Sequence, residues 1–310
     1  MKPYYEDDSL TLHHGDALKI ARELPSGSVD CIVTSPPYFG LRDYGNEGQY
    51  GLEETPAAYV ETMRALFNEL RRVLADDGTL WLNIGDSYSS GSRKSYDTEG
   101  GKTRARGHSS QRPTSDLPGK NLLGIPWRVA FALQDDGWFL RNEIIWNKPN
   151  AMPESVTDRL STRHENLFMF SKTKSYWFDL DPIREEATTT EARAGTNALR
   201  GQKSMREAGP NSGRYNPKGK NPGDVWTIAT QPFHGSHFAT MPKELARRAI
   251  VAGCKPGGTV LDPFSGSGTT GLVAQENGRK YIGIDISSEY LKLSLATRLS
   301  NGVLDLGALA

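Results

Sequence analysis

The sequence predicts an α/β fold built on a doubly wound, mainly parallel sheet with an antiparallel edge. Short apolar runs alternate with segments of helical periodicity, an order that is typical of parallel sheets. Two of these runs end in loops rich in proline, glycine and serine, which are residues that break regular structure. Two further apolar runs, 143–146 and 166–170, are candidates for an antiparallel pair at the edge of the sheet.

The first strand of the expected sheet, Val29–Val33, opens into the loop Thr34-Ser35-Pro36-Pro37-Tyr38. Thr55 is suited to cap the next helix, which has a proline at its first position. Apolar residues then recur at helical spacing as far as Gly78, and the apolar run 79–84 predicts the next strand. A strand, a helix and a strand in this order predict parallel pairing through a right-handed crossover. The Ser-Pro-Pro loop therefore belongs at the carboxyl edge of the sheet.

The second half of the chain predicts a similar unit around a glycine-rich loop. A helix over Pro242–Ala252 precedes the strand Gly258–Asp262, which runs into Pro263-Phe264-Ser265-Gly266-Ser267-Gly268. A further helix and the strand Lys280–Asp285 complete the unit. Another helix is expected over Ile125–Leu133, ahead of the two edge strands.

Two irregular basic segments interrupt this pattern. Residues 87–120 are rich in Gly, Ser and Arg and predict a mobile basic loop. Residues 184–222 again lack apolar periodicity and are the best candidate for an inserted target-recognition region. The catalytic and cofactor-binding domain is therefore expected to comprise residues 1–183 and 223–310, with the insertion between them.

The composition is that of a globular protein without an overall electrostatic attraction to nucleic acid. The 37 Lys and Arg residues are balanced by 37 Asp and Glu residues, so any binding of DNA must use local basic patches. Cys31 and Cys254 are too few for a disulfide framework or a cysteine-based zinc site. The sequence starts without a signal-peptide pattern, and no stretch approaches the roughly 18 apolar residues of a membrane span. We expect a cytoplasmic protein that does not bind membranes.

The glycine-rich loop is suited to a nucleoside cofactor. It joins a strand to the start of a helix, and Asp285 follows the next strand, where it is placed to accept hydrogen bonds from ribose hydroxyls. Gly266, Gly268 and Gly271 match the G-x-G-x-x-G spacing of dinucleotide sites, so a nicotinamide cofactor must be considered. However, Asp262 at the strand end would repel a pyrophosphate. An acid there suits a ligand with an amine and a sulfonium, as in S-adenosylmethionine.

Both loops also resemble sequence motifs of a known family. The loop from Asp262 to Thr270 resembles motif I of the DNA amino-methyltransferases, and the loop from Thr34 to Tyr38 resembles their motif IV. The catalytic motif comes first in the chain, as in the permuted β group of that family. The resemblance implies the Rossmann-like methyltransferase sheet, S-adenosyl-L-methionine as cofactor and a bacterial or phage origin.

The resemblance also implies two sets of site residues. The catalytic set is Ser35, Pro36, Pro37 and Tyr38. The cofactor-binding set is Asp16, Thr34, Asp262, Pro263, Phe264, Gly266, Gly268, Thr269, Thr270 and Asp285. Within these sets, Asp16 corresponds to the aspartate that contacts the adenine of the cofactor. The segment Phe238–Leu245 corresponds to one that packs beside the cofactor.

The Ser-Pro-Pro-Tyr loop suits amine methylation on physical grounds as well. A base amine is a poor nucleophile because its lone pair is delocalised into the ring. Ser35 Oγ and the Pro36 carbonyl can accept the two amine protons, which favours a pyramidal nitrogen whose lone pair attacks a methyl group in line. Consecutive prolines fix the loop in advance. Because the amine is unreachable inside a duplex, the nucleotide must flip out, and Tyr38 offers a ring on which the base can stack.

Ser35 also bears on the identity of the target base. Family members with serine at this position tend to modify cytosine N4, whereas members with aspartate tend to modify adenine N6. We therefore expect a site-specific DNA-methyltransferase (cytosine-N4-specific), with adenine N6 methylation as the alternative. Methylation of cytosine C5 would need a thiolate, but Cys31 lies inside the strand ahead of the loop. A catalytically silent DNA-binding protein with the same fold is an alternative of another class.

The expected partner is double-stranded DNA, bound by a monomer or a homodimer, and a cognate restriction endonuclease is a candidate second partner. No metal is expected, because the pairs His13-His14 and His234/His237 lack companion ligands. An alternative in which Pro-Pro-Tyr is an exposed ligand for a partner domain is disfavoured by the buried strand that precedes it.

Overall fold

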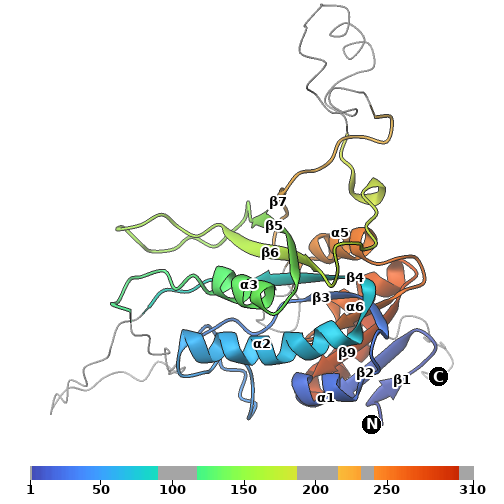
Figure 1. Ribbon diagram of the computed structural model, residues 1–310. Helices are drawn as coiled ribbons and strands as arrows, with labels where there is room; N and C mark the ends of the chain where they lie inside the picture. Colours follow the sequence, from blue (N-terminus) through green and yellow to red (C-terminus); the bar gives the residue numbers. More distant parts are fainter. Residues whose placement is uncertain (1, 90–116, 187–215, 232–240, 300–310) are drawn as a thin grey trace, which may run out of the picture.

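The computed structural model describes residues 2–89, 117–186, 216–231 and 241–299 (Figure 1). Within these residues the strands form one nine-stranded sheet in the order β1-β2-β9-β8-β3-β4-β6-β5-β7. The strands are β1 (Tyr5–Glu6), β2 (Leu10–His14), β3 (Val29–Thr34), β4 (Leu74–Ile84), β5 (Phe139–Asn147), β6 (His164–Ser171), β7 (Val225–Thr227), β8 (Thr259–Asp262) and β9 (Lys280–Asp285). The helices are α1 (Ala17–Glu23), α2 (Pro56–Val73), α3 (Ile125–Asp135), α5 (Lys243–Gly253), α6 (Thr269–Glu276) and α7 (Ser288–Ser294), with a short 3-10 turn at Asp181–Ile183 and a π-helical turn at Leu295–Leu299.

The centre of the sheet is parallel, as the sequence predicts. Strands β2, β9, β8, β3 and β4 run in one direction, and β3 lies between β8 and β4. Strand β6 pairs antiparallel with both β4 and β5, which confirms the expected antiparallel edge. Strand β7 adds to β5 in parallel. The carboxyl ends of the parallel strands and the amino end of β6 therefore meet at the same edge of the sheet.

Helices cover both faces of the sheet, so the fold is doubly wound (Figure 1). Helices α1, α2 and α3 contribute to the hydrophobic core on one face, and α5, α6 and α7 contribute to the core on the other. Helix α2 begins where the sequence predicts, because Thr55 Oγ1 accepts a hydrogen bond from the Ala58 N–H at 3.1 Å and Pro56 occupies the first helical position. Its buried residues recur every three or four positions and form one apolar stripe against the sheet.

The boundary between α2 and β4 differs from the sequence prediction. The helix ends at Val73 and not near Gly78, because β4 begins at Leu74, which pairs with Val29 of β3. The next pair is Cys31 with Thr79, so residues 75–78 form a bulge in β4. Gly78 closes this bulge at a point where a Cβ atom would lie 2.6 Å from Leu74 Cδ1. Apolar periodicity alone does not reveal such a bulge.

Only the two ends of each basic segment are described. In the first, the Ser89 N–H donates to the Asn121 carbonyl, and Tyr88 forms a β-bridge with Leu122. In the second, Glu185 and Lys220 form a bridge that joins the two ends of the segment. Residues 90–116 and 187–215 lie outside the described residues, so the mobile loop at 87–120, the recognition region at 184–222 and the resulting domain division stay predictions.

None of the helices in the described residues has the length and the apolar character needed to cross a bilayer.

The close approach of α5 to β4 gives a test of stability. A Cβ atom on Gly253 would lie 2.1 Å from Trp81 Nε1 and 2.5 Å from Thr79 Oγ1, and both of these side chains are buried. We expect Gly253→Ala to force α5 away from the sheet and to lower the free energy of unfolding by about 1–3 kcal/mol. Urea denaturation followed by circular dichroism measures this loss. An unchanged unfolding midpoint would show that α5 withdraws from β4 without cost.

Candidate active site

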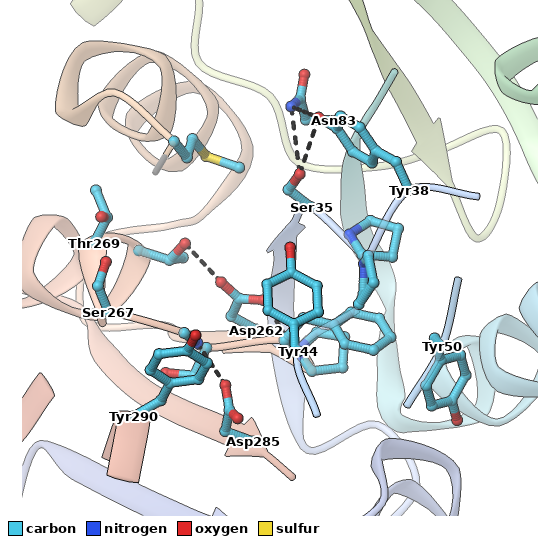
Figure 2. Close-up of a pocket in the computed structure, with 18 of the residues that line it drawn as sticks. Ser35, Tyr38, Tyr44, Tyr50, Asn83, Asp262, Ser267, Thr269, Asp285 and Tyr290 are labelled. Carbon is cyan, nitrogen blue, oxygen red and sulfur yellow. Dashed lines mark hydrogen bonds between the residues drawn. The ribbon is translucent and has the colours of Figure 1, made fainter. Parts of the chain in front are cut away.

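The loops at the carboxyl edge of the sheet enclose a cavity of about 370 Å³ (Figure 2). Its walls come from the loops that follow β2, β3, β8 and β9, and from residues of β4, β5 and β6. Because β3 pairs directly with β8, the loops that follow these two strands lie side by side. Thr34 and Asp262, which end the two strands, are 228 positions apart in the chain. The two sequence motifs therefore face one space.

Asp262 is a buried carboxylate held by three hydrogen bonds. It accepts from Thr34 Oγ1 at 2.7 Å, from Thr270 Oγ1 at 2.8 Å and from the Phe264 N–H at 3.0 Å. Burial raises the pKa of Asp262 to about 6, although these donors act in the opposite direction. Asp262 therefore presents a fixed, mainly ionised carboxylate to the cavity at neutral pH.

Asp285 ends the neighbouring strand β9 and organises the glycine loop. Its carboxylate accepts from the Gly266 N–H at 2.7 Å and from the Ser287 N–H at 2.8 Å. Burial raises the pKa of Asp285 as well. Gly268, at the start of α6, has φ +77°, a conformation that favours glycine, and a Cβ atom there would lie 2.9 Å from Ser294 Cβ. The loop geometry thus requires glycine at this position.

Asp16 and two aromatic rings form another part of the cavity wall. Asp16 caps α1 by accepting from the Lys19 N–H at 2.9 Å, and it also accepts from Tyr50 Oη at 3.3 Å. The Tyr50 ring stands edge-on to Phe264, with 5.1 Å between the ring centroids. This region therefore combines a carboxylate with aromatic surface.

A second polar cluster lies around the Ser-Pro-Pro-Tyr loop (Figure 2). The Tyr38 hydroxyl donates to Glu165 Oε2 at 2.6 Å, and it accepts from Asn83 Nδ2 at 2.7 Å and from Ser35 Oγ at 3.2 Å. Asn83 Nδ2 also donates to Glu165 Oε2 at 2.9 Å. Burial and the nearby Glu165 carboxylate raise the pKa of Tyr38 well above its usual value, so its hydroxyl keeps its proton. Glu165 in turn forms an ion pair with Lys148.

One carbonyl of the proline loop is fixed by a hydrogen bond, and another is left without a donor among the described residues. Tyr59 Oη donates to the Pro37 carbonyl at 3.0 Å. Nothing in the described part of the chain donates a hydrogen bond to the Pro36 carbonyl. Gly85, just after β4, makes room for the Tyr38 ring, because a Cβ atom there would lie 2.6 Å from Tyr38 Cε2.

The structure brings most of the predicted site residues to this one cavity. Those that line it are Asp16, Ser35, Pro36, Pro37, Tyr38, Asp262, Pro263, Phe264, Gly266, Thr269, Thr270 and Asp285. Thr34 and Gly268 are not part of the lining: Thr34 is fully buried behind Asp262, and Gly268 shapes the turn into α6. Of the segment Phe238–Leu245, residues 238–240 lie outside the described residues, and Met241 reaches the cavity.

Sequence reasoning missed several residues of the cavity wall. They are Tyr44, Tyr50, Asn83, Trp146, Glu165 and Tyr290. Asn83 gave the clearest available signal, because it is a polar residue near the end of the apolar strand β4 and is only 2% exposed. The others come from loops and edge strands whose position depends on the tertiary fold.

The chain is similar to known proteins along most of its length, and this similarity shows its family. A family model described as DNA methylase matches residues 29–296. The chain belongs to the DNA methylase family. This DNA methylase is 48% identical to the Type II methyltransferase M.Cfr9I of Citrobacter freundii over 291 residues, which cover 94% of this chain and 88% of that protein. It is 50% identical to the Type II methyltransferase M.XycI of Xanthomonas campestris pv. cyanopsidis over 285 residues, or 92% and 86% of the two chains.

Solved structures share the fold of this DNA methylase at lower sequence identity. PvuII DNA methyltransferase (cytosine-N4-specific) superposes with a TM-score of 0.64 at 22% identity, over 94% of this chain and 87% of that one. The complex of M1.HpyAVI with S-adenosylmethionine gives a TM-score of 0.52 at 20% identity, over 93% and 97% of the two chains. These likenesses confirm the predicted methyltransferase type of sheet.

This DNA methylase is therefore a member of a family of S-adenosylmethionine-dependent DNA methyltransferases. When bound, the cofactor supplies a methyl group carried on a positively charged sulfur. The residues of the cavity fit such a ligand, because the carboxylates of Asp16, Asp262 and Asp285 suit its positive charge and its ribose hydroxyls. Phe264 and Tyr50 offer aromatic surface for an adenine ring. The G-x-G-x-x-G spacing thus belongs to a methyltransferase loop and not to a nicotinamide site.

The raised pKa of Asp262 predicts that cofactor binding depends on pH. The carboxyl group is ionised above about pH 6 and neutral below it, and only the ionised form attracts a cationic ligand. We expect the affinity for S-adenosylmethionine to rise by about tenfold between pH 5 and pH 7, and then to level off. Isothermal titration calorimetry measures this profile. The Asp262→Asn variant should bind more weakly at pH 7 and show no step near pH 6; the same step in that variant would assign it to another group.

Proposed function

We propose that this protein methylates the N4 amine of a flipped-out cytosine at a specific site in double-stranded DNA. The proposal rests on one observation above all: Ser35 and Pro36 line the same cavity as Asp262 and Asp285. A cavity with acids for a cationic methyl donor and with paired acceptors for an amine suits methyl transfer between the two. In this proposal, the acids and the glycine loop bind the cofactor, and the Ser-Pro-Pro-Tyr loop holds the base.

The hydrogen bonds of Tyr38 support an acceptor role for Ser35. The single proton of the Tyr38 hydroxyl goes to Glu165, and both of its lone pairs accept protons, one from Asn83 and one from Ser35. Ser35 gives its proton to Tyr38 and accepts from Asn83 Nδ2 at 3.4 Å, so its oxygen keeps one lone pair as an acceptor for an amine proton. The Pro36 carbonyl offers the second acceptor. Two acceptors on the amine protons favour the pyramidal nitrogen that attacks a methyl group in line.

The same chain of hydroxyls offers a route for the proton that the amine must lose after transfer. When nitrogen gains a methyl group, it carries one proton too many. Ser35 donates toward Tyr38, and Tyr38 donates toward Glu165, so each hydroxyl can take a proton from the amine side and pass one on. We assign Glu165 as the end of this route, where the neighbouring Lys148 holds the carboxylate in place.

The choice of cytosine rests on Ser35, because family members with serine here tend to modify cytosine N4. Similar proteins include one named for cytosine and one named for adenine. PvuII DNA methyltransferase is named cytosine-N4-specific, whereas YhdJ of Escherichia coli, 28% identical over 295 residues, is named a DNA adenine methyltransferase. Adenine N6 is therefore the second candidate. A catalytically silent protein is disfavoured, because the Ser-Pro-Pro-Tyr loop and its hydrogen bonds are complete.

Partners beyond the target duplex are also proposals. We assign target recognition to residues 184–222, because this segment is basic and stands outside both motifs. A cognate restriction endonuclease fits the naming of the similar proteins as Type II methyltransferases. A bacterial or phage-encoded protein of the cytoplasm, acting as a monomer or homodimer, completes the proposal.

Nucleoside analysis tests the target base directly. The protein is incubated with unmethylated genomic DNA and S-adenosylmethionine labelled in its methyl group, and the digested nucleosides are separated. We expect the label in N4-methylcytosine, and much less of it when Ser35→Ala replaces the parent protein. Label in N6-methyladenine would overturn the cytosine assignment. An absence of label in every nucleoside would overturn the proposed activity.

A double-mutant cycle tests the acceptor role of Ser35. Tyr38→Phe keeps the ring and removes the hydroxyl, so we expect kcat to fall by about 10- to 100-fold while the affinity for S-adenosylmethionine is unchanged. Tyr38→Ala should lose more, because the surface for base stacking also disappears. In the Ser35→Ala background, Tyr38→Phe should cost little more, since its effect passes through Ser35. Single losses that simply multiply would contradict this coupling.

A further inference from the structure

The connection between β5 and β6 carries two apolar side chains that project into solvent. In this segment, residues 148–163, hereafter the hairpin arm, Met152 is 87% exposed and Leu160 is 91% exposed. Every other large hydrophobic residue in the described part of the chain is markedly less exposed, the next being Val225 at 59%. Single exposed apolar residues are common on proteins, but two nearly uncovered ones on one short segment suggest a partner that covers them.

Met152 and Leu160 are exposed although the hairpin arm makes several contacts with the rest of the protein. Within the arm, Arg159 forms an ion pair with Glu154 at 2.6 Å. Across to the segment after β4, Asp158 pairs with Lys120 at 2.5 Å, and the Arg159 guanidinium lies 4.2 Å from the centroid of the Tyr88 ring. Glu154, Asp158 and Arg159 of the arm are thus paired with neighbours, while Met152 and Leu160 stay exposed.

The hairpin arm starts and ends at the active-site cavity. Lys148 at its first position and Glu165 just beyond its end both line the cavity and pair with each other. Met152 follows Lys148 by four residues, and Leu160 precedes Glu165 by five. A chain spans at most about 3.6 Å per residue, so the Cα atoms of Met152 and Leu160 lie within roughly 14–18 Å of those of Lys148 and Glu165. Figure 1 shows the arm extending beyond the sheet, on the same side as the loop that follows β4.

The charges of the hairpin arm suit a nucleic acid. Both acids of the arm, Glu154 and Asp158, are neutralised by ion pairs. Arg163 is exposed and forms no ion pair among the described residues, so its guanidinium is available for a phosphate. The acids of the arm are already paired, so they offer no free charge to the basic residues of a protein partner. The remaining positive charge, that of Arg163, attracts a DNA backbone.

We propose that Met152 and Leu160 enter the base stack of double-stranded DNA at the step that the flipped nucleotide leaves. The proposal rests on the proposed function, which requires a flipped base. A nucleotide that leaves the duplex breaks stacking on both sides and leaves an apolar gap. Methionine and leucine are among the side chains that proteins insert as wedges between base steps. Inserted side chains replace the lost stacking and slow the return of the base.

The test compares matched and mismatched duplexes that contain the methylated site, after that site has been identified by methylation-sensitive sequencing of DNA from expressing cells. In the mismatched duplex the target base is already unpaired and flips at lower cost. We expect the double variant Met152→Ala/Leu160→Ala to lose about tenfold or more in kcat/KM on the matched duplex. On the mismatched duplex it should recover to within about threefold of the parent protein.

Phe139→Ala is the control variant. Phe139 is 41% exposed and lies at the amino end of β5, away from the cavity, so this change should leave both duplexes unaffected. In a second measurement, a 2-aminopurine–thymine pair replaces the target base pair, so that the probe base is still paired in the free duplex. The fluorescence of the probe base should rise when the parent protein binds, and rise less with the double variant, because unstacking of the base relieves quenching.

Two outcomes would overturn the proposal that Met152 and Leu160 enter the base stack. Equal loss on the matched and mismatched duplexes would make the arm a contact surface that plays no part in opening the helix. No loss on either duplex would mean that the two side chains serve another partner, such as a protein. Failure of the proposed function looks different, since the parent protein itself would then methylate neither duplex.

Discussion

The active site depends on one short hydrogen bond between two strands that are distant in sequence. Thr34 Oγ1, at the end of β3, donates to the carboxylate of Asp262, at the end of β8, at 2.7 Å. The parallel pairing of these strands brings the residues together, and the bond then fixes the loop that carries Ser35 relative to the loop that carries the glycines. A methyl group moves in line over a short distance, so small errors in this relative position are costly. Thr34 therefore contributes to the site although it does not line the cavity.

The two ends of the cavity differ in electrostatic character, and each suits what it is proposed to hold. At the glycine loop, Asp262 and Asp285 are buried acids, and a cationic ligand would relieve the cost of keeping them ionised. Around Tyr38, the carboxylate of Glu165 is balanced by Lys148, and the other polar groups are neutral. A neutral base amine thus meets aligned hydrogen-bond acceptors, and the methyl donor meets negative charge.

The sequence predicted those parts of the fold and the site that depend on local chemistry. Apolar runs located β3, β8 and β9, and the loops after β3 and β8 identified most of the cavity wall. The predicted end of α2 was wrong, because Leu74 pairs with Val29 and already begins β4, so the residues up to Gly78 belong to the strand and its bulge. Asn83 and Glu165 were missed for a similar reason. They meet only because β6 returns antiparallel beside β4, and no local pattern specifies that register.

The bridge between Glu185 and Lys220 has a consequence for how this protein family diversifies. It joins the two ends of the segment between them, and those ends leave the rest of the fold side by side. The entropic cost of a closed loop grows slowly with length, by about 0.6 kcal/mol for each doubling. A change in the length of this stretch therefore costs little in loop-closure entropy as long as the bridge between Glu185 and Lys220 is kept. Under the proposed role of residues 184–222 in target recognition, the sequence preference of the protein could then change while Ser35 and Asp262 keep their places.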